Sequence, residues 1–147
     1  MTICTAHRVT WFDTAEIAEA VLSQIKRSAI QHQFAILAYC FMPDHVHLLV
    51  EGRTPDANLQ TFVKHAKQIT GYEHRQRHAK ALWQPSWYDR VLRKEEETRE
   101  VIKYILLNPV RAGLVKSAAD YPLSGSEVYA VRDILEDVVR DVKPGTD

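Results

Sequence analysis

The sequence predicts an α+β sandwich, in which an antiparallel sheet is covered on one face by helices. Residues 34–42 and 45–52 are two β-rich runs separated by the polar break Pro43-Asp44, which is typical of a hairpin in the centre of a sheet. Stretches with apolar residues at helical spacing alternate with such runs along the chain. The expected order is therefore strand, helix, two strands, helix, strand and helix.

The composition is that of one globular domain. The chain has 147 residues, of which 46% are hydrophobic and 26% charged, and these proportions exclude a disordered chain. No apolar run is long enough to span a membrane, and the first residues lack the pattern of a secretory signal. Cys4 and Cys40 cannot form a disulfide framework or a Cys-x-x-Cys zinc site. We expect a cytoplasmic protein with reduced cysteines.

The first half of the chain supplies an edge strand and two helices around the hairpin. The short β-prone segment TICTA begins almost at the first residue. Asp13 and Thr14 offer N-caps for a helix over residues 15–33, whose apolar residues recur at helical spacing. Asp56 or Asn58 begins a second helix, which carries a basic outer face.

The second half begins with a tryptophan-rich segment, LWQPSWYDRVLR, that we expect to contain a short strand over residues 88–92. A third helix is expected over residues 95–108, with an acidic start that suits the helix dipole and with Pro109 as its stop. A loop then leads to a final amphipathic helix over residues 126–141.

Charge is unevenly distributed, although the net charge is zero. Residues 53–116 carry thirteen basic and seven acidic side chains, a balance of +6, whereas residues 1–52 and 117–147 balance to −2 and −4. A basic middle is typical of a surface that binds a polyanion such as nucleic acid. A solvated helix surface would carry the same charges, so charge alone leaves both interpretations open.

His45 and His47 stand two residues apart in an expected strand, so both imidazoles project from the same face of the sheet. Such a pair can offer two nitrogen ligands to one metal ion close to a turn, where a strand end meets solvent. The alternative is that one or both are structural histidines with hydrogen-bonded rings.

Tyr104 and Asn108 stand four residues apart near the end of the third expected helix, which brings a phenol and an amide to one helix face. Taken alone, Tyr104 fits a tyrosine at the margin of the core with its hydroxyl in water. Asn108, just before Pro109, fits a turn residue.

Longer motifs combine these residues. FMPDHVHLLVEG, LWQPSWYDRVLR and YILLNPVRAGLV together resemble the single-tyrosine HUH transposases, and the REP-associated tyrosine transposases (the IS200-like family) in particular. The resemblance covers about residues 1–116, which we take as the catalytic domain. Residues 117–147 are then a C-terminal loop and helix, either part of the same unit or a short acidic tail without a counterpart.

The resemblance implies a ferredoxin-like or RRM-like fold and a role for each site residue. His45 and His47 match the two histidine ligands of a divalent metal, Mg²⁺ or Mn²⁺, and Asn108 matches the polar residue that completes the metal site. Tyr104 matches the nucleophile, which attacks a scissile phosphate of single-stranded DNA and leaves a 5′-phosphotyrosine and a free 3′-hydroxyl. No general base is identified; His65 is a weak candidate.

Single-stranded or hairpin DNA is the partner that the resemblance implies, with activity at the bacterial nucleoid, no membrane and a possible homodimer. The basic residues expected at phosphates are Lys64, Lys67, Arg75, Arg77, Arg90, Arg93 and Arg111. The aromatic residues expected to stack on unpaired bases are Trp83, Trp87 and Tyr88, which core anchoring would explain as well.

Two alternatives to an active transposase stay open. A domesticated, non-catalytic protein would bind DNA hairpins without forming a covalent adduct. A metal-dependent phosphoesterase would use His45 and His47 with a water nucleophile, and its activity would survive Tyr104→Phe.

Overall fold

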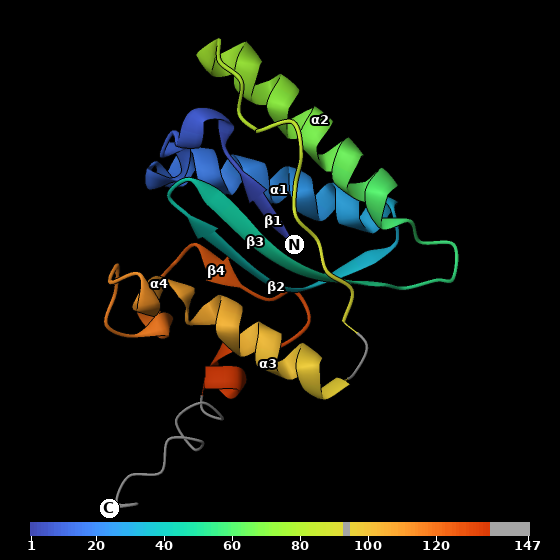
Figure 1. Cartoon of the computed structure of the whole chain (residues 1–147), viewed down its shortest axis with the longest axis vertical. Coiled ribbons are helices and arrows are strands. Elements are labelled where there is room, and N and C mark those ends of the chain that lie inside the picture. Colours follow the sequence, from blue (N-terminus) through green and yellow to red (C-terminus); the bar gives the residue numbers. More distant parts are fainter. Residues whose placement is uncertain (93–94, 136–147) are drawn as a thin grey trace, which may run out of the picture.

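The computed structural model, which describes residues 1–92 and 95–135, shows a four-stranded antiparallel sheet with strand order β1-β3-β2-β4 (Figure 1). The strands are β1 (Thr2–Cys4), β2 (Phe34–Met42), β3 (His45–Gly52) and β4 (Ser124–Gly125). The predicted α+β sandwich is confirmed, and so is the position of the histidine-bearing strand inside the sheet.

The β2–β3 hairpin has the bounds that the sequence predicts. Met42 pairs with His45 across the two-residue turn Pro43-Asp44. Every residue of β2 except Tyr39 is buried, which explains why this strand is a continuous apolar run rather than an alternating one.

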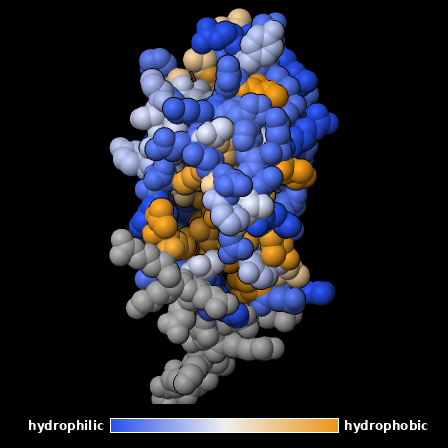
Figure 2. Space-filling view, turned by 90° about the vertical axis from the view of Figure 1, so that its right-hand side faces the viewer, coloured by the Kyte–Doolittle hydropathy of each residue, from blue (hydrophilic) through white to orange (hydrophobic). Residues whose placement is uncertain are grey.

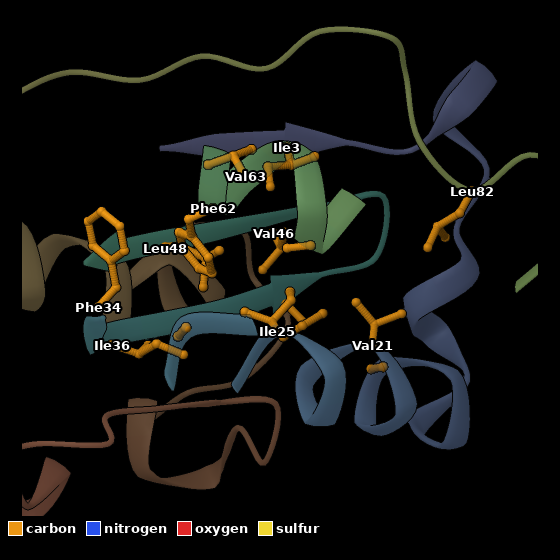
Figure 3. Close-up of a cluster of buried hydrophobic side chains, with 14 of the residues drawn as sticks. Ile3, Val21, Ile25, Phe34, Ile36, Val46, Leu48, Phe62, Val63 and Leu82 are labelled. Carbon is orange, nitrogen blue, oxygen red and sulfur yellow. The ribbon is translucent and has the colours of Figure 1, made fainter. Parts of the chain in front are cut away.

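Helices cover both faces of the sheet. α1 (Ala15–Gln31) and α2 (Leu59–His78) pack on one face around a buried cluster drawn in Figure 3, whereas α3 (Glu95–Leu106) packs on the other with a second cluster (Figure 1). The expectation of helices on one face only is therefore wrong. Apolar periodicity predicts a helix with one buried stripe, but it does not say which face of a sheet that stripe meets.

Local signals set the helix ends. Asn58 caps α2, because its side-chain oxygen accepts a hydrogen bond from the Thr61 backbone N–H at 3.0 Å. Ala79 ends the helix in the left-handed conformation, with φ of 57°. No helix among the described residues combines the length and the hydropathy needed to cross a membrane.

The tryptophan-rich segment forms no strand over residues 88–92, so that prediction is wrong. The segment instead runs beside the outer edge of β1 through two isolated bridges, Thr2 with Tyr88 and Thr5 with Trp83. Backbone hydrogen bonds in both directions join Thr2 and Tyr88 at 2.8 and 3.0 Å. The short edge strand is thereby covered by an irregular stretch of chain.

The chain after α3 packs on the same domain. Tyr121 donates its hydroxyl to the carbonyl of Phe41, β4 pairs with β2, and Ile134 is buried in the cluster under α3. Of the final predicted helix, residues 131–135 are helical, residues 126–130 are not, and residues 136–141 lie outside the described residues. The division of the chain at residue 116 stays a prediction.

Candidate active site

His45 and His47 lie on β3 and project from the sheet face that α3 covers. Val46 and Leu48, their neighbours in the strand, are buried in the cluster on the α1–α2 side (Figure 3), so strand alternation turns both imidazoles to the other face. The two rings lie 4.8 Å apart between centroids, at an interplanar angle of 86°. The histidines thus share one face, as their spacing predicts.

A chain of polar contacts holds the His45 ring. Its Nδ1 lies 2.7 Å from Oδ1 of Asp44, and Oδ2 of Asp44 accepts a hydrogen bond of 2.8 Å from Nε of Arg8. Burial of Asp44 would raise the pKa of its carboxyl, but the hydrogen bonds from Arg8 and His45 outweigh burial and lower this pKa. The ionised Asp44 therefore orients the His45 imidazole through Nδ1. The other ring nitrogen, Nε2, is the one that could bind a metal ion.

Thr2 holds the His47 ring, because its hydroxyl lies 3.0 Å from Nδ1 of the imidazole. Burial lowers the pKa of His47 to about 4, helped by the charges of His45, the N-terminal ammonium and Arg111. His47 is therefore neutral at physiological pH, which is the form of imidazole that binds metal ions.

The paired histidines fit a divalent cation with open coordination positions. Each Nδ1 already has a partner, so two Nε2 atoms remain as ligands from one sheet face. In residues 1–92 and 95–135, no group of three His, Cys, Asp or Glu side chains is arranged to hold a metal ion. Amide oxygens, water or substrate would have to supply the remaining ligands, as Mg²⁺ and Mn²⁺ accept.

Tyr104 lies on α3 with 61% of its surface exposed. It lines a groove of about 650 Å³ together with His47 and Tyr88. The guanidinium of Arg111 lies 3.7 Å from the centroid of the Tyr104 ring, and its Nη2 donates a hydrogen bond of 2.6 Å to the Tyr104 carbonyl. One groove therefore joins the candidate nucleophile to a histidine of the pair.

Asn108 does not continue the helix of Tyr104, which corrects the expected helix over residues 95–108. α3 ends at Leu106, and Asn108 begins the short helix α4 (Asn108–Arg111). Pro109 causes the break, because it has no N–H and its ring would clash with the carbonyl four residues earlier. Leu107 alone separates the two helices, and the role of Asn108 as a ligand stays a prediction.

Three residues of the proposed DNA-binding set lie close to this site. Tyr88, with 76% of its surface exposed, and Arg90 line the same groove as His47 and Tyr104. Arg111 stacks on the Tyr104 ring. An exposed aromatic ring and two guanidinium groups are suited to an unpaired base and to phosphates.

The proposed DNA-binding residues that belong to α2 lie elsewhere. Lys64, Arg75 and Arg77 are exposed on α2, which covers the opposite face of the sheet from α3. Figure 2 shows mostly hydrophilic side chains over the upper part of the molecule, where Figure 1 places α2. None of the three lines the groove of Tyr104. Arg93 lies outside the described residues.

Both tryptophans and Lys67 serve the fold of the segment that covers β1. Trp83 packs against the core and donates from Nε1 to the Thr70 hydroxyl at 2.8 Å. Trp87 also packs against the core, and its Nε1 donates to Asp89 at 3.0 Å. Lys67 donates to the carbonyls of residues 84 and 86. For the tryptophans these contacts favour the core-anchor alternative over stacking on bases.

His65 is not close to the site. It lies on α2, where its Nδ1 is 2.8 Å from the Ser28 hydroxyl and its ring packs beside His32. It is therefore not a candidate base for a reaction at Tyr104. Sequence reasoning missed Arg8, Asp44 and Thr2; of these, only Asp44 gave a signal, as an acidic residue directly before His45.

The comparisons define the class of protein first: residues 1–107 match the family described as "Transposase IS200 like". The chain belongs to the IS200-like transposase family. It is 30% identical over 132 residues to the REP-associated tyrosine transposase of Escherichia coli K12, an alignment that covers 78% of this chain and 74% of that protein.

Two further comparisons agree with this family assignment. A protein of Haemophilus influenzae assigned as a REP-associated tyrosine transposase is 27% identical over 113 residues, which is 69% of this chain but 64% of that protein's length. The solved structure of a REP-associated tyrosine transposase bound to a REP hairpin matches with a TM-score of 0.72 and 23% identity, over 97% of this chain and 79% of the other. This structural likeness shows a shared fold.

Proposed function

We propose that the protein cleaves and rejoins single-stranded DNA beside a hairpin, with Tyr104 as the nucleophile. The observation that carries the proposal is the groove of about 650 Å³ in which Tyr104 and His47 of one chain meet. Membership of the IS200-like transposase family supports a DNA rearrangement, and the relative solved with a REP hairpin supports hairpin DNA as the partner.

The reaction is a transesterification at a phosphodiester. The phenol oxygen of Tyr104 forms a bond to the scissile phosphorus, and the bond between phosphorus and the 3′ oxygen breaks. The phenol gives up its proton, and the leaving 3′ oxygen takes one up, so charge and atoms balance. Attack of a 3′-hydroxyl on the phosphotyrosine reverses these steps and rejoins the strands without an external energy source.

The residues around Tyr104 bind the substrate and stabilise charge. Arg111 places a positive charge over the Tyr104 ring, 3.7 Å from its centroid, and would stabilise the negative charge that develops at the attacked phosphate. His45 and His47, with Asn108, would hold Mg²⁺ or Mn²⁺, an ion that when bound polarises a scissile phosphate. Tyr88 offers its exposed face to an unpaired base, and Arg90 contacts phosphate.

The test uses single-stranded oligonucleotides that carry a hairpin, labelled at either end, with Mn²⁺ or Mg²⁺. We expect the protein to become covalently attached to the fragment downstream of the nick. Tyr104→Phe and added chelator each abolish the adduct. The matched control is Tyr72→Phe, because Tyr72 is an exposed tyrosine on α2 and its variant keeps the adduct.

The same gels distinguish the two alternatives. Cleavage that persists in Tyr104→Phe overturns the tyrosine mechanism and favours a phosphoesterase with a water nucleophile. Hairpin binding without cleavage, across a panel of hairpin sequences and both metals, overturns the enzymatic proposal and favours a non-catalytic DNA-binding protein.

A further inference from the structure

The turn between β2 and β3 is held by a distant segment, residues 5–12, to which the reaction proposed above gives no role. The backbone N–H of Thr5 donates to the carbonyl of Asp44 at 2.9 Å, and that of Phe12 donates to the carbonyl of Pro43 at 3.0 Å. The Thr5 hydroxyl lies 3.1 Å from the same Asp44 carbonyl, and Thr5 is completely buried. The segment therefore fixes the backbone directly before the first histidine of the candidate metal site.

Two consecutive residues of this segment have an unfavourable backbone conformation. His7 and Arg8 have φ of 56° and 55°, in the left-handed region that residues other than glycine rarely adopt. The conformation costs free energy at both positions, and it persists only where the surrounding structure holds it. Because such residues cluster at functional sites, this pair favours a role for one of the two side chains in the position that the turn gives it.

Arg8 has the contacts that account for this conformation. Its Nε donates to Oδ2 of Asp44 at 2.8 Å, and its Nη1 donates to Sγ of Cys4 at 3.2 Å. The Arg8 side chain is 52% exposed, and an ion pair at such exposure adds little to the stability of the fold. The effect of the guanidinium on the Asp44 carboxylate is therefore a better explanation of its position than a gain in stability.

Arg8 acts on His45 through Asp44. Because Arg8 occupies Oδ2, the other carboxylate oxygen, Oδ1, lies 2.7 Å from Nδ1 of His45. A carboxylate only accepts hydrogen bonds, so the proton of a neutral imidazole is held on Nδ1, and Nε2 carries the lone pair that a metal ion needs. The terminal torsion of an aspartate is soft, so without the guanidinium the carboxylate would turn more freely and Nδ1 would lose a fixed acceptor.

We propose that Arg8 is a positioning residue of the candidate active site. Held by the left-handed turn at residues 7 and 8, it fixes the Asp44 carboxylate and, through it, the tautomer and the orientation of His45. The inference rests on the proposed function, in which His45 is a metal ligand. Loss of Arg8 then disturbs metal binding and leaves the nucleophile Tyr104 in place.

The test compares two glycine variants that relieve the same backbone conformation. Glycine adopts positive φ without strain, so Arg8→Gly and His7→Gly both suit the turn, but only Arg8→Gly removes the guanidinium. The readout is the long-range ¹H–¹⁵N correlation spectrum of the histidine rings, without metal or DNA, at about pH 8, where ordinary imidazoles are neutral. We expect a single His45 tautomer, protonated at Nδ1, in the unmodified chain and in His7→Gly, and both tautomers in Arg8→Gly.

Mn²⁺ binding is a second readout, measured by electron paramagnetic resonance of the free ion. We expect Arg8→Gly to bind Mn²⁺ about tenfold more weakly than the unmodified chain, and His7→Gly to bind it with unchanged affinity. Arg8→Lys keeps a positive charge at this position and recovers part of the affinity. The ring of His47, which Thr2 holds, is an internal control whose tautomer stays unchanged in all three variants.

The outcomes separate this inference from the proposed function. A single Nδ1-protonated tautomer of His45 in Arg8→Gly, or equal changes in Arg8→Gly and His7→Gly, overturns the positioning role. A change at His47 as large as that at His45 also overturns it, because the effect of Arg8 would then be general. Arg8→Gln carries the same expectations if Arg8→Gly does not fold. An adduct that survives Tyr104→Phe overturns the proposed function and leaves the tautomer result as it is.

Discussion

At the scale of single residues, Asp44 is the group that orients the candidate metal ligand His45. Asp44→Ala removes the contact of 2.7 Å to Nδ1, so the imidazole loses its fixed orientation. We expect about 10- to 100-fold weaker apparent Mn²⁺ affinity, measured as the metal concentration for half-maximal adduct formation. Asp56→Ala, at an exposed turn, is the control; an equal effect of the two variants would refute the positioning role.

Buried histidines predict sensitivity to acid. Burial is the main cause that lowers the pKa of both His47 and His74 to about 4, whereas the unfolded chain protonates histidine near pH 6.5. Between about pH 6.5 and 4 the unfolded chain binds more protons than the folded one, so the free energy of unfolding falls as pH falls. Each histidine contributes a loss of about 1 to 2 kcal/mol at pH 5.

Urea unfolding at pH 7.5 and pH 5, with chelator present, measures this loss. His74→Gln flattens the dependence because its side chain does not titrate, whereas the exposed His7→Gln leaves it unchanged. A pH profile that His74→Gln leaves as steep as before would contradict the assignment of the loss to this residue.

Sequence reasoning reached the histidine pair because strand alternation is local, and two residues of spacing suffice to put both rings on one face. It did not reach Thr2 or Arg8. Thr2 meets His47 only through the register of β1 against β3, and Arg8 lies 36 residues from Asp44. The stacking of Arg111 on Tyr104 runs across the break between α3 and α4, whose geometry the spacing of the two residues does not give.

At the scale of the elements, the N-cap of α2 makes a measurable contribution to the free energy of unfolding. Asn58 accepts the Thr61 backbone N–H, and Asn58→Ala leaves that donor without its partner. We expect the free energy of unfolding to drop by about 1 kcal/mol in urea titrations. Gln60→Ala, at an exposed position on the same helix, is the control with a near-zero effect. A drop as small in Asn58→Ala as in Gln60→Ala would refute the cap.

The elements that could be predicted are those whose signal is contained in their own residues. Both strands of the hairpin and the start of α2 match their predicted bounds, because β-rich runs, a Pro-Asp turn and a capping Asn act locally. The face that α3 covers and the irregular path of residues 82–88 could not be predicted. Both depend on packing against parts of the chain that are distant in the sequence.

At the scale of the whole molecule, Tyr104 and His47 of one chain line the same groove, which supports an active site formed within one chain. We therefore expect that mixing Tyr104→Phe protein with His45→Ala/His47→Ala protein does not restore adduct formation. A site shared between the chains of a homodimer would give substantial activity in the mixture. Light scattering of each variant confirms that both have the same mass as the unmodified protein.

The two faces of the sheet also predict separate effects on DNA. Arg90→Gln acts in the groove, and we expect it to lower both hairpin affinity and the cleavage rate of bound DNA. Arg75→Gln with Arg77→Gln acts on α2, and we expect it to lower affinity and its salt dependence but not the cleavage rate. Single-turnover cleavage at saturating protein distinguishes these outcomes; a slower rate in the α2 variant would contradict the separation.

The irregular segment beside β1 has a consequence for the behaviour of the protein in concentrated solution. A three-residue outer strand with free N–H and C=O groups is a template for pairing with other molecules, and so for aggregation. The bridges at Thr2 and Thr5 pair this edge with the segment, and Trp83 anchors the segment in that position. Residue 88 of the same segment also lines the groove. Colloidal stability and the proposed recognition of DNA thus depend on one stretch of chain, and selection on either would constrain the other.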